Sequence, residues 1–222
     1  MPAWAGTSKM AKKFDRSLLP EAPDLSFEIA LWHSGVQNVA GIDEAGRGAL
    51  AGPVAAAVLI LPDDPDLVFS LAGVRDSKQM LPAEREAWAP KLRLCALAYG
   101  VGFASPQEID HIGIVPATRL AIVRAMAYLE IMPQHLLLDY LELPECSLPQ
   151  TPLVKGDARS LSIAGASVLA KTARDEQMRQ LDTQYPGYGF ALHKGYGTAM
   201  HRQALERSGP SPIHRRSFHF KN

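Results

Sequence analysis

VAGIDEAGRGALAGPVAAAVLI, residues 39–60, is the segment from which the architecture of this chain is most directly predicted. Its first part, residues 39–43, is compatible with a strand and leads into a turn that contains Gly46 and Gly48. Its last part continues into residues 54–61, a run of small and branched apolar residues that is typical of a buried strand. Two apolar runs joined by a glycine-rich connection predict a β-hairpin.

The segments after this hairpin alternate between helical and strand patterns. Ser105 and Pro106 form a good helix start, with the serine as the cap. Three strands followed by helix–strand–helix units predict an α/β sheet that mixes antiparallel and parallel pairing. Further strands are expected at residues 96–104, 135–139 and 152–154, and helices at residues 82–94, 115–131 and 161–181.

The first 36 residues differ from the rest, because they carry three prolines and little periodicity. We expect residues 1–36 to form a partly ordered extension of unknown role, with a short helix around residues 25–33. Residues 37–222 would then form one domain. A chain of 222 residues fits one α/β domain with short additions, and it can bury a sizeable core without disulfides.

The composition argues against secretion and against a membrane protein. Cys95 and Cys146 form no C-x-x-C pair, which speaks against a zinc finger or a disulfide framework and favours a reducing cytoplasm. The longest apolar run, residues 49–61, is too short to cross a bilayer. The lysines near the N-terminus are followed by no apolar signal core. We therefore expect a cytoplasmic protein without membrane segments.

The charge is balanced overall but uneven along the chain. Lys and Arg together number 23, as do Asp and Glu, so the whole chain lacks the basic excess of many nucleic-acid binders. Residues 193–222 nevertheless hold six Lys or Arg, four histidines and one acidic residue, Glu206. This tail would suit contacts with phosphates, and it would equally suit a solvated terminal helix and coil.

Four acids stand where a carboxylate is costly. Asp43 and Glu44 follow an apolar strand, Asp139 ends the run of three leucines before it, and Asp157 precedes the long helix. An acid on a core strand must be paired, protonated or bound to a metal. Carboxylates at strand ends suit Mg²⁺ or Mn²⁺, which prefer oxygen ligands, whereas the absence of a Cys/His cluster makes zinc a poor candidate.

The same acids also have a structural interpretation as helix caps or members of ion pairs. Adjacent residues of a regular strand point to opposite faces, so Asp43 and Glu44 can share one metal only if the strand ends or bulges there. Gly46 and Gly48 would permit such an irregularity. The glycine turn could simply be tight, or it could bring backbone groups and Arg47 close to a ligand.

The order of these motifs resembles that of the type 2 ribonuclease H family, and of bacterial ribonuclease HII in particular. The segment Gly41-Ile42-Asp43-Glu44-Ala45-Gly46-Arg47-Gly48 looks like the signature of that family. The resemblance extends in order from about residue 37 to 220. It rests also on Asp76-Ser77-Lys78, Leu137-Leu138-Asp139, Lys155-Gly156-Asp157, residues 162–175, residues 185–190, residues 193–198 and residues 214–218.

The resemblance implies a ribonuclease H-like α/β fold: a five-stranded mixed sheet flanked by helices, with a C-terminal helical and coil extension. Residues 37–222 would be one catalytic domain that includes a C-terminal substrate-contacting segment. The catalytic and metal-binding carboxylates would be Asp43, Glu44, Asp139 and Asp157. Recognition of the ribonucleotide 2′-hydroxyl and of the RNA–DNA junction would fall to Gly46, Arg47, Gly48 and Tyr196.

The implied activity is endonucleolytic hydrolysis of the RNA strand of RNA–DNA hybrids, and cutting 5′ to single ribonucleotides in duplex DNA, as in ribonucleotide excision repair. The products would carry a 3′-hydroxyl and a 5′-phosphate. Two Mg²⁺ or Mn²⁺ ions about 3.5–4 Å apart would stabilise the attacking and leaving oxygens. We further expect Lys171, Lys194 and Arg215 to contact phosphates, which positions a duplex without reading its sequence.

One departure from the family pattern lies beside a catalytic acid, where Tyr140 follows Asp139 in place of the usual glycine. Two alternatives to a ribonuclease H stay open. A junction resolvase or transposase-like nuclease would share the acids but need no 2′-hydroxyl recognition. A non-catalytic duplex-binding module would have no use for four acids beside a polyanion. The expected partners are RNA–DNA hybrids and ribonucleotide-containing DNA, with the chain acting as a monomer. Residues 217–222 are a candidate for a partner-binding peptide of the sliding-clamp type.

Overall fold

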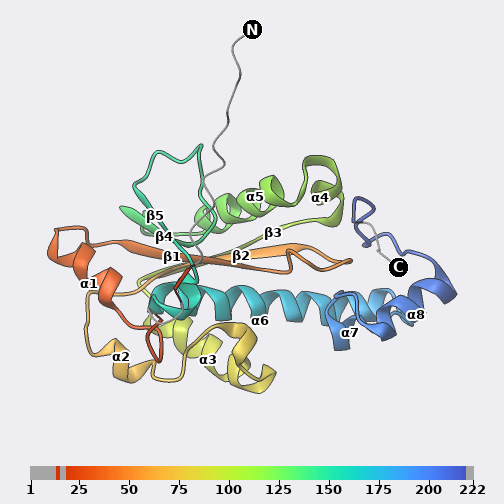
Figure 1. The fold of residues 1–222 in the computed structure, drawn as a ribbon, viewed down its shortest axis with the longest axis horizontal. Helices are drawn as coiled ribbons and strands as arrows, with labels where there is room; N and C mark the ends of the chain where they lie inside the picture. Colours follow the sequence, from red (N-terminus) through yellow and green to blue (C-terminus); the bar gives the residue numbers. More distant parts are fainter. Residues whose placement is uncertain (1–13, 16–18, 219–222) are drawn as a thin grey trace, which may run out of the picture.

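The computed structural model of the chain describes residues 14–15 and 19–218. Its centre is one sheet of five strands in the order β3-β2-β1-β4-β5 (Figure 1). The hairpin strands β1 and β2 are antiparallel, as are β2 and β3, whereas β4 runs parallel to β1 and β5 parallel to β4. The predicted mixed α/β sheet is therefore confirmed. The strands are β1 (Val39–Ala45), β2 (Val54–Ile60), β3 (Ala98–Ala104), β4 (His135–Asp139) and β5 (Gln150–Leu153).

Helices cover both faces of this sheet, and α6 and α5 make the largest contributions. In Figure 1, α6 runs beneath the strands while α4 and α5 lie above them. The tail continues from the far end of α6 into two further helices, in agreement with the expected C-terminal helical and coil extension. The helices are α1 (Ser26–His33), α2 (Leu67–Ser70), α3 (Pro82–Cys95), α4 (Pro106–Ile112), α5 (Ile114–Met126), α6 (Leu161–Gln184), α7 (Phe190–His193) and α8 (Ala199–Ser208), with short 3₁₀ turns η2 (Ser77–Gln79) and η3 (Gly156–Ala158).

Strand β1 is buried on both faces, and its alternation assigns each side chain to one of two cores. Val39 and Ala45 pack with α6, whereas Ala40 and Ile42 pack with α5. Because successive side chains of a strand point to opposite faces, Asp43 lies on the α6 face. Helix α6 approaches this face closely at Gly41, where a Cβ atom would lie 2.2 Å from the Ser162 carbonyl carbon.

The N-terminal segment contributes to the same core. The expected short helix is confirmed as α1, and Leu25 and Trp32 are buried with residues of α6. The Glu28 carboxylate lies fully buried at the start of α6, where it accepts hydrogen bonds from Ser160 Oγ (2.6 Å) and from the Ser162 N–H (3.0 Å). The second half of the N-terminal extension therefore packs as part of the domain.

Several boundaries differ from the expected ones, and β3 begins at Ala98 instead of residue 96. Helix α5 ends at Met126 instead of residue 131, because the chain then forms tight turns such as Tyr128 N–H to Ala125 O (3.2 Å) and bends back toward β4. Helix α6 runs three residues further than predicted, and β5 begins two residues earlier. The candidate clamp-binding peptide lies mostly in residues 219–222, outside the described residues, so it is not tested.

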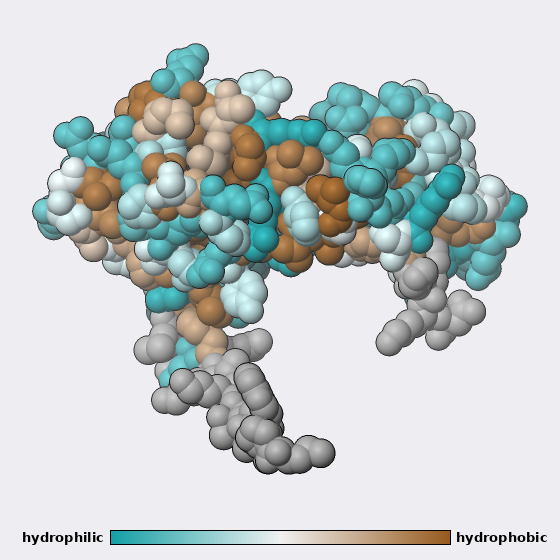
Figure 2. Space-filling model, turned by 90° about the horizontal axis from the view of Figure 1, so that it is seen from above, coloured by the Kyte–Doolittle hydropathy of each residue, from teal (hydrophilic) through white to brown (hydrophobic). Residues whose placement is uncertain are grey.

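The surface is mixed in polarity. Figure 2 shows hydrophilic side chains spread over both ends of the molecule on the face seen from above, with smaller hydrophobic areas between them. Among residues 14–15 and 19–218, no helix combines the length and the apolar content that a membrane span requires.

The buried Glu28 predicts a measurable dependence of stability on pH. Burial raises the pKa of this carboxyl above its ordinary value of 4.5, although Ser160 and Ser162 donate hydrogen bonds that lower it. A folded-state pKa above the unfolded one gives stability that is present in acid and is lost as the pH rises through the folded pKa. Glu28→Gln should therefore gain thermal stability relative to the wild type as the pH rises above the ordinary glutamate pKa of 4.5.

The measurement is the midpoint of thermal unfolding of both proteins across that range. Glu21→Gln changes an exposed carboxyl of the same type and serves as the matched control. Parallel pH profiles for the wild type and Glu28→Gln would contradict the prediction.

Candidate active site

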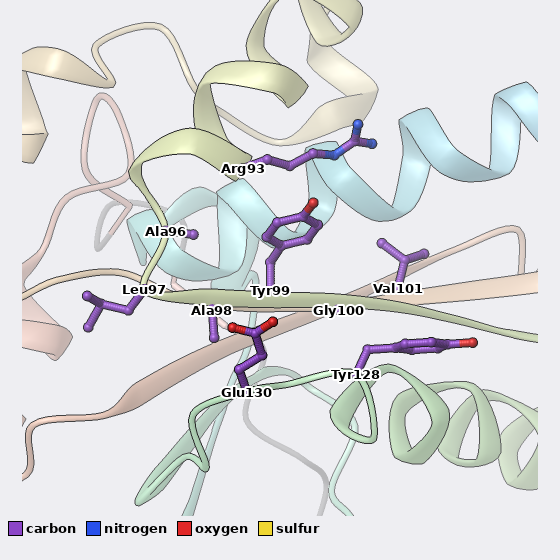
Figure 3. A pocket seen from close by; sticks show the side chains of 9 residues that line it. All are labelled: Arg93, Ala96, Leu97, Ala98, Tyr99, Gly100, Val101, Tyr128 and Glu130. Carbon is purple, nitrogen blue, oxygen red and sulfur yellow. The ribbon is translucent and has the colours of Figure 1, made fainter.

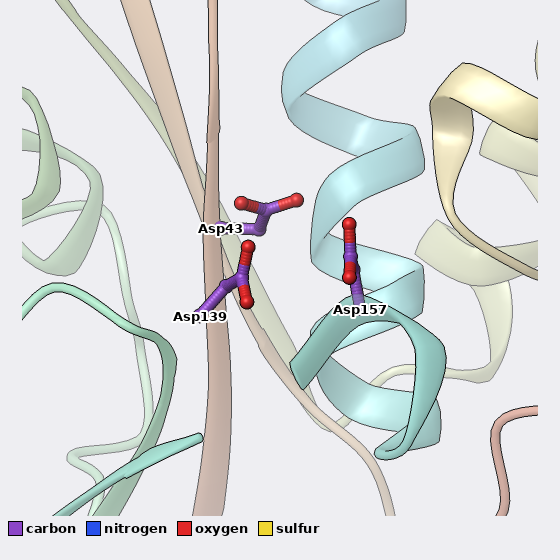
Figure 4. A group of neighbouring side chains, drawn as sticks. All are labelled: Asp43, Asp139 and Asp157. Carbon is purple, nitrogen blue, oxygen red and sulfur yellow. The ribbon is translucent and has the colours of Figure 1, made fainter. Parts of the chain in front are cut away.

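The parallel pairing of β1 with β4 brings two of the expected acids side by side. The register joins Ile42 to Leu138, so Asp43 and Asp139 follow as neighbours at the carboxyl ends of the two strands. Leu137, two residues before Asp139, packs on the α6 face, which is also the face of Asp43. Both carboxylates therefore point toward α6, as Figure 4 shows.

The third acid comes from the loop that precedes α6. Lys155 adopts a left-handed conformation (φ 55°), which starts the 3₁₀ turn η3 and directs Asp157 toward the strands. The N–H group of Gly156 donates to Asp139 Oδ1 (2.8 Å) and so ties this turn to β4. One carboxylate oxygen from each of Asp43, Asp139 and Asp157 lies within 4.8 Å of the other two.

Burial and mutual repulsion raise the pKa of all three acids. The pKa of Asp43 lies well above its ordinary 3.8 because of burial first, and then because of the charges of Glu44 and Asp139. Burial, followed by the charges of Asp139 and Asp76, raises the pKa of Asp157 to about 6. Burial also raises the pKa of Asp139. A cation bound among the three carboxylates would offset the repulsion between their negative charges.

A divalent metal fits this group. Asp43 Oδ1 accepts the Glu44 N–H (2.7 Å), whereas its Oδ2 is buried and has no hydrogen-bond partner among the described residues. Glu28 Oε2 is likewise buried without a partner, so the meeting of three carboxylates, more than this one oxygen, favours a bound ion. The donor set consists of carboxylates alone, which suits Mg²⁺ or Mn²⁺ better than softer metals.

The fourth expected acid, Glu44, occupies a different position. Among the described residues, the oxygens that gather within 4.8 Å come from the three aspartates and leave Glu44 out. Its Oε1 accepts a hydrogen bond from Arg47 Nη1 (3.0 Å). The pairing of β1 with β2 runs without interruption through Ala45 and Ala55, so the irregularity that Gly46 and Gly48 would permit at residues 43–44 does not occur. Burial raises the pKa of Glu44 although the contact with Arg47 lowers it, and the charges of Lys78 and Asp157 also act on it, so its carboxylate lies at the rim of the group.

The glycine turn after β1 is held from beneath by Arg215. This side chain is only 2% exposed, and its guanidinium donates to the carbonyls of Gly46 (2.8 Å), Arg47 (2.9 Å) and Gly52 (3.0 Å). Burial, and then the charge of Arg174, lowers the pKa of Arg215 to about 9. Arg215 was expected to contact phosphate, and each of its three guanidinium nitrogens instead donates to a backbone carbonyl.

A second buried arginine, Arg174, completes this support and was not anticipated from the sequence. Its Nε donates to the Pro53 carbonyl (2.9 Å), and a Cβ atom on Gly46 would lie 1.9 Å from the same Nε. Gly46 also has a φ of +93°, which favours glycine. The guanidinium carbon of Arg174, Cζ, lies over the ring of Tyr196, 5.4 Å from the ring centroid.

The remaining expected contacts lie around Tyr196. This ring is partly exposed (36%), and Lys171 Nζ lies 5.7 Å from its centroid. Lys171 is itself paired with Asp175 (2.6 Å), and Lys194 Nζ donates to the Ala191 carbonyl. The structure therefore gathers Lys171 and Tyr196 beside the glycine turn, with both lysines already engaged in local contacts.

Sequence reasoning assigned no role to Lys78, which lies next to the acids. Its Nζ is 3.6 Å from Asp157 Oδ2 and 3.8 Å from Asp76 Oδ1, and the side chain is 70% exposed. Burial alone would lower its pKa, but the charges of Asp43, Asp76 and Asp157 outweigh burial and raise it. The available signal was the Asp76-Ser77-Lys78 segment, which carried part of the resemblance without a function.

Tyr140, which stands where the family pattern has glycine, follows Asp139 directly. It adopts a left-handed conformation (φ 67°), and its side chain is exposed. Glycine adopts this conformation without strain, which explains the usual residue. The Tyr140 N–H donates to the carbonyls of Leu138 and Leu153 (both 3.0 Å), so the loop keeps its contacts with β4 and β5.

A separate hollow lies along β3, the edge strand of the sheet on the side away from β4 (Figure 3). Its walls include Tyr99, Tyr128 and Arg93, and it contains a single carboxylate, Glu130. The hollow therefore lacks the acid cluster that distinguishes the ends of β1 and β4.

Residues 40–221 match the family model described as Ribonuclease HII. The chain is 54% identical over 198 residues to the Ribonuclease HII of Synechococcus sp. (strain JA-3-3Ab), covering 88% of each. It is 53% identical over 200 residues to that of Chloroflexus aurantiacus (strain ATCC 29364 / DSM 637 / Y-400-fl), covering 88% of this chain and 93% of the relative.

The solved structure of ribonuclease H2 from Pyrococcus horikoshii OT3 superimposes with a TM-score of 0.68 at 28% identity, covering 82% of this chain and 93% of that one. The resemblance inferred from the motifs is thereby confirmed. The matched residues include strands β2, β4 and β5, nearly all of β1, and all three gathered aspartates. The chain therefore belongs to the ribonuclease HII family, the metal-dependent endonucleases that act on RNA–DNA hybrids.

Proposed function

We propose that this ribonuclease H also cuts on the 5′ side of a single ribonucleotide embedded in duplex DNA, by two-metal-ion hydrolysis that leaves a 3′-hydroxyl and a 5′-phosphate. The observation that carries the proposal is the buried Asp43, whose Oδ2 has no donor in the described part of the chain, next to Asp139 and a glycine turn. The proposal combines a metal site with a means of recognising a ribose.

In this proposal Asp43, Asp139 and Asp157 would hold two Mg²⁺ or Mn²⁺ ions. Glu44 joins them when its carboxylate leaves Arg47, a contact of 3.0 Å at the rim of the site. Bound divalent ions lower the pKa of water and offset the charge that develops on phosphate oxygens. The repulsion among the acids favours cation binding, and the Gly156 N–H keeps the Asp139 carboxylate oriented.

Recognition of the ribonucleotide would rest on Gly46, Arg47 and Gly48. The 2′-hydroxyl is the group that distinguishes RNA from DNA, and backbone groups of a turn can contact it without reading a base. Arg215 supports this role indirectly, since it holds the carbonyls of Gly46 and Arg47. We therefore assign Arg215 to positioning the turn instead of contacting phosphate.

Tyr196 would pack against the RNA–DNA junction, with Lys171 and Lys194 near the phosphates. Burial lowers the pKa of both lysines. Phosphate contacts of this kind orient a duplex but do not select a sequence. We propose that the chain acts as a monomer in the cytoplasm, a compartment that the unpaired Cys95 and Cys146 suit.

The first test compares cleavage by the wild type and Asp43→Asn. The substrates are an RNA–DNA hybrid, a DNA duplex with one ribonucleotide and an all-DNA duplex, each with Mg²⁺, Mn²⁺ or EDTA. We expect cutting 5′ to the ribonucleotide only with metal, and a loss of at least about a hundredfold in Asp43→Asn, since even groups behind a metal ligand contribute 10–100-fold.

Asp63→Asn, a change at an exposed aspartate, is the matched control and should keep full activity. Cutting of the all-DNA duplex would favour the resolvase-like alternative. Cutting of the long hybrid without cutting at the single ribonucleotide would contradict the proposed specificity while leaving the family activity intact.

The second test separates the two glycines of the turn. Gly46→Ala meets Arg174 and should lower the thermal unfolding midpoint. A Cβ atom on Gly48 would meet nothing within 4 Å. Gly48→Ala should therefore leave the unfolding midpoint unchanged yet lower kcat/KM on the single-ribonucleotide duplex by about tenfold or more, because the added methyl obstructs only the substrate. Unchanged kinetics for Gly48→Ala would contradict close approach of the substrate there.

The third test uses the pH dependence of metal binding. Metal ligands must be deprotonated, and the pKa of Asp157 is raised to about 6. Mn²⁺ affinity should therefore fall by about tenfold per pH unit below about pH 6 for each proton displaced. Titration calorimetry in buffers of different ionisation enthalpy counts the released protons. Equal affinity at about pH 5 and about pH 7, without proton release, would contradict the raised pKa values.

A further inference from the structure

Three buried histidines lie behind Tyr196, outside the metal site. His193 ends α7, His201 lies in the first turn of α8, and His214 follows in the tail. The rings of His193 and His201 stack with centroids 4.3 Å apart, and Phe190 packs against all three. The site described above uses none of these imidazoles, although burying them requires each ring nitrogen to find a partner.

Backbone N–H groups determine the tautomers of His193 and His214, and the contact with His214 then determines the tautomer of His201. The Ser211 N–H donates to His214 Nδ1 (2.9 Å), so that nitrogen carries no proton and the proton of neutral His214 is on Nε2. The Ser211 hydroxyl (2.8 Å) and carbonyl (3.3 Å) also lie near the same nitrogen. His214 Nε2 lies 3.0 Å from His201 Nε2, which must therefore accept.

His201 then carries its proton on Nδ1, which donates to the Tyr196 carbonyl (3.1 Å). His193 is determined independently, because the Gly195 N–H donates to its Nδ1 (3.2 Å) and its Nε2 donates to the Tyr188 carbonyl (2.8 Å). Burial lowers the pKa of His201 to about 4 and also lowers that of His214, in agreement with neutral rings.

We propose that His201 and His214 form a neutral hydrogen-bonded pair, the histidine relay, which positions Tyr196 for cutting at an RNA–DNA junction. The inference rests on the proposed function through the role of Tyr196. His201 is a positioning residue here, since it reaches the substrate only through the main chain of Tyr196.

The contacts of the neighbouring residues explain why this carbonyl matters. The Gly195 carbonyl accepts the N–H groups of Leu50 (2.8 Å) and Ala51 (3.3 Å), which follow the glycine turn. Gly195 also has a positive φ, and a Cβ atom there would lie 2.3 Å from the Ala51 carbonyl oxygen. Tyr196 is therefore held on both sides: the peptide before it contacts the chain after the glycine turn, and the peptide after it contacts the histidine relay.

The direct test is nuclear magnetic resonance of the imidazole nitrogens in the wild-type protein at neutral pH. We expect neutral rings, with the proton on Nδ1 in His201 and on Nε2 in both His193 and His214. A charged His201, or one with its proton on Nε2, would overturn the relay. This result is independent of cleavage and of any variant.

The functional test is a double-mutant cycle between His201 and Tyr196. His201→Leu should lower kcat/KM on the single-ribonucleotide duplex by about tenfold, because the Tyr196 carbonyl keeps only the Thr198 N–H (2.8 Å) as a donor and His214 loses its partner. His201→Asn keeps a donor where Nδ1 lies and should recover most of this loss. His33→Leu, at an exposed histidine, is the matched control. Unchanged Mn²⁺ affinity in each variant verifies that the protein is folded.

In the Tyr196→Ala background, His201→Leu should have little further effect. Equal losses in both backgrounds would overturn a role through Tyr196. If Tyr196→Ala itself leaves junction cutting unchanged, the proposed role of Tyr196 fails, and this outcome is distinct from a failure of the tautomer assignment.

Discussion

The repulsion among buried carboxylates at the ends of β1 and β4 is the constraint on which the rest of the molecule depends. Asp43 and Asp139 are neighbours because the two strands are parallel and in register, and Asp157 is directed at them by the turn before α6. Such a cluster destabilises a fold unless a cation joins it. The core must therefore supply stability elsewhere, and the two apolar layers under α5 and α6 do so.

The two buried arginines leave the acids of the cluster without a guanidinium partner. Arg174 and Arg215 are nearly inaccessible, yet they donate to backbone carbonyls of the glycine turn and its continuation instead of to the acids. A guanidinium paired with Asp43 would satisfy its free oxygen and displace a metal. Among the described residues, Lys78 is the cation beside the aspartates, and its exposed side chain can move away. The arrangement keeps positive charge beside the glycine turn and leaves the acids available to metal.

The outcome of the predictions follows from the range of the interactions involved. The strands and helices came from local periodicity, which is why the hairpin and α6 were placed within a few residues. The predicted end of α5 was wrong because the chain must turn back toward β4, and that turn depends on tertiary packing instead of local periodicity. The irregularity that would let Asp43 and Glu44 share one metal does not occur, because pairing with β2 keeps the strand regular to Ala45. Arg215 was expected to contact phosphate, but it is buried and its guanidinium donates to backbone carbonyls of the glycine turn.

The linear order of residues was enough to determine the mixed sheet, the family and three acids of the site, because each of these leaves a local pattern of apolar runs, glycines and carboxylates. The tertiary structure alone decided which acids meet, because that depends on strand register and on the face to which each side chain points. It also decided that two arginines hold the glycine turn and that His201 faces the Tyr196 carbonyl. Those contacts join residues whose partners lie far along the chain or across a helix turn, and periodicity carries no information about them.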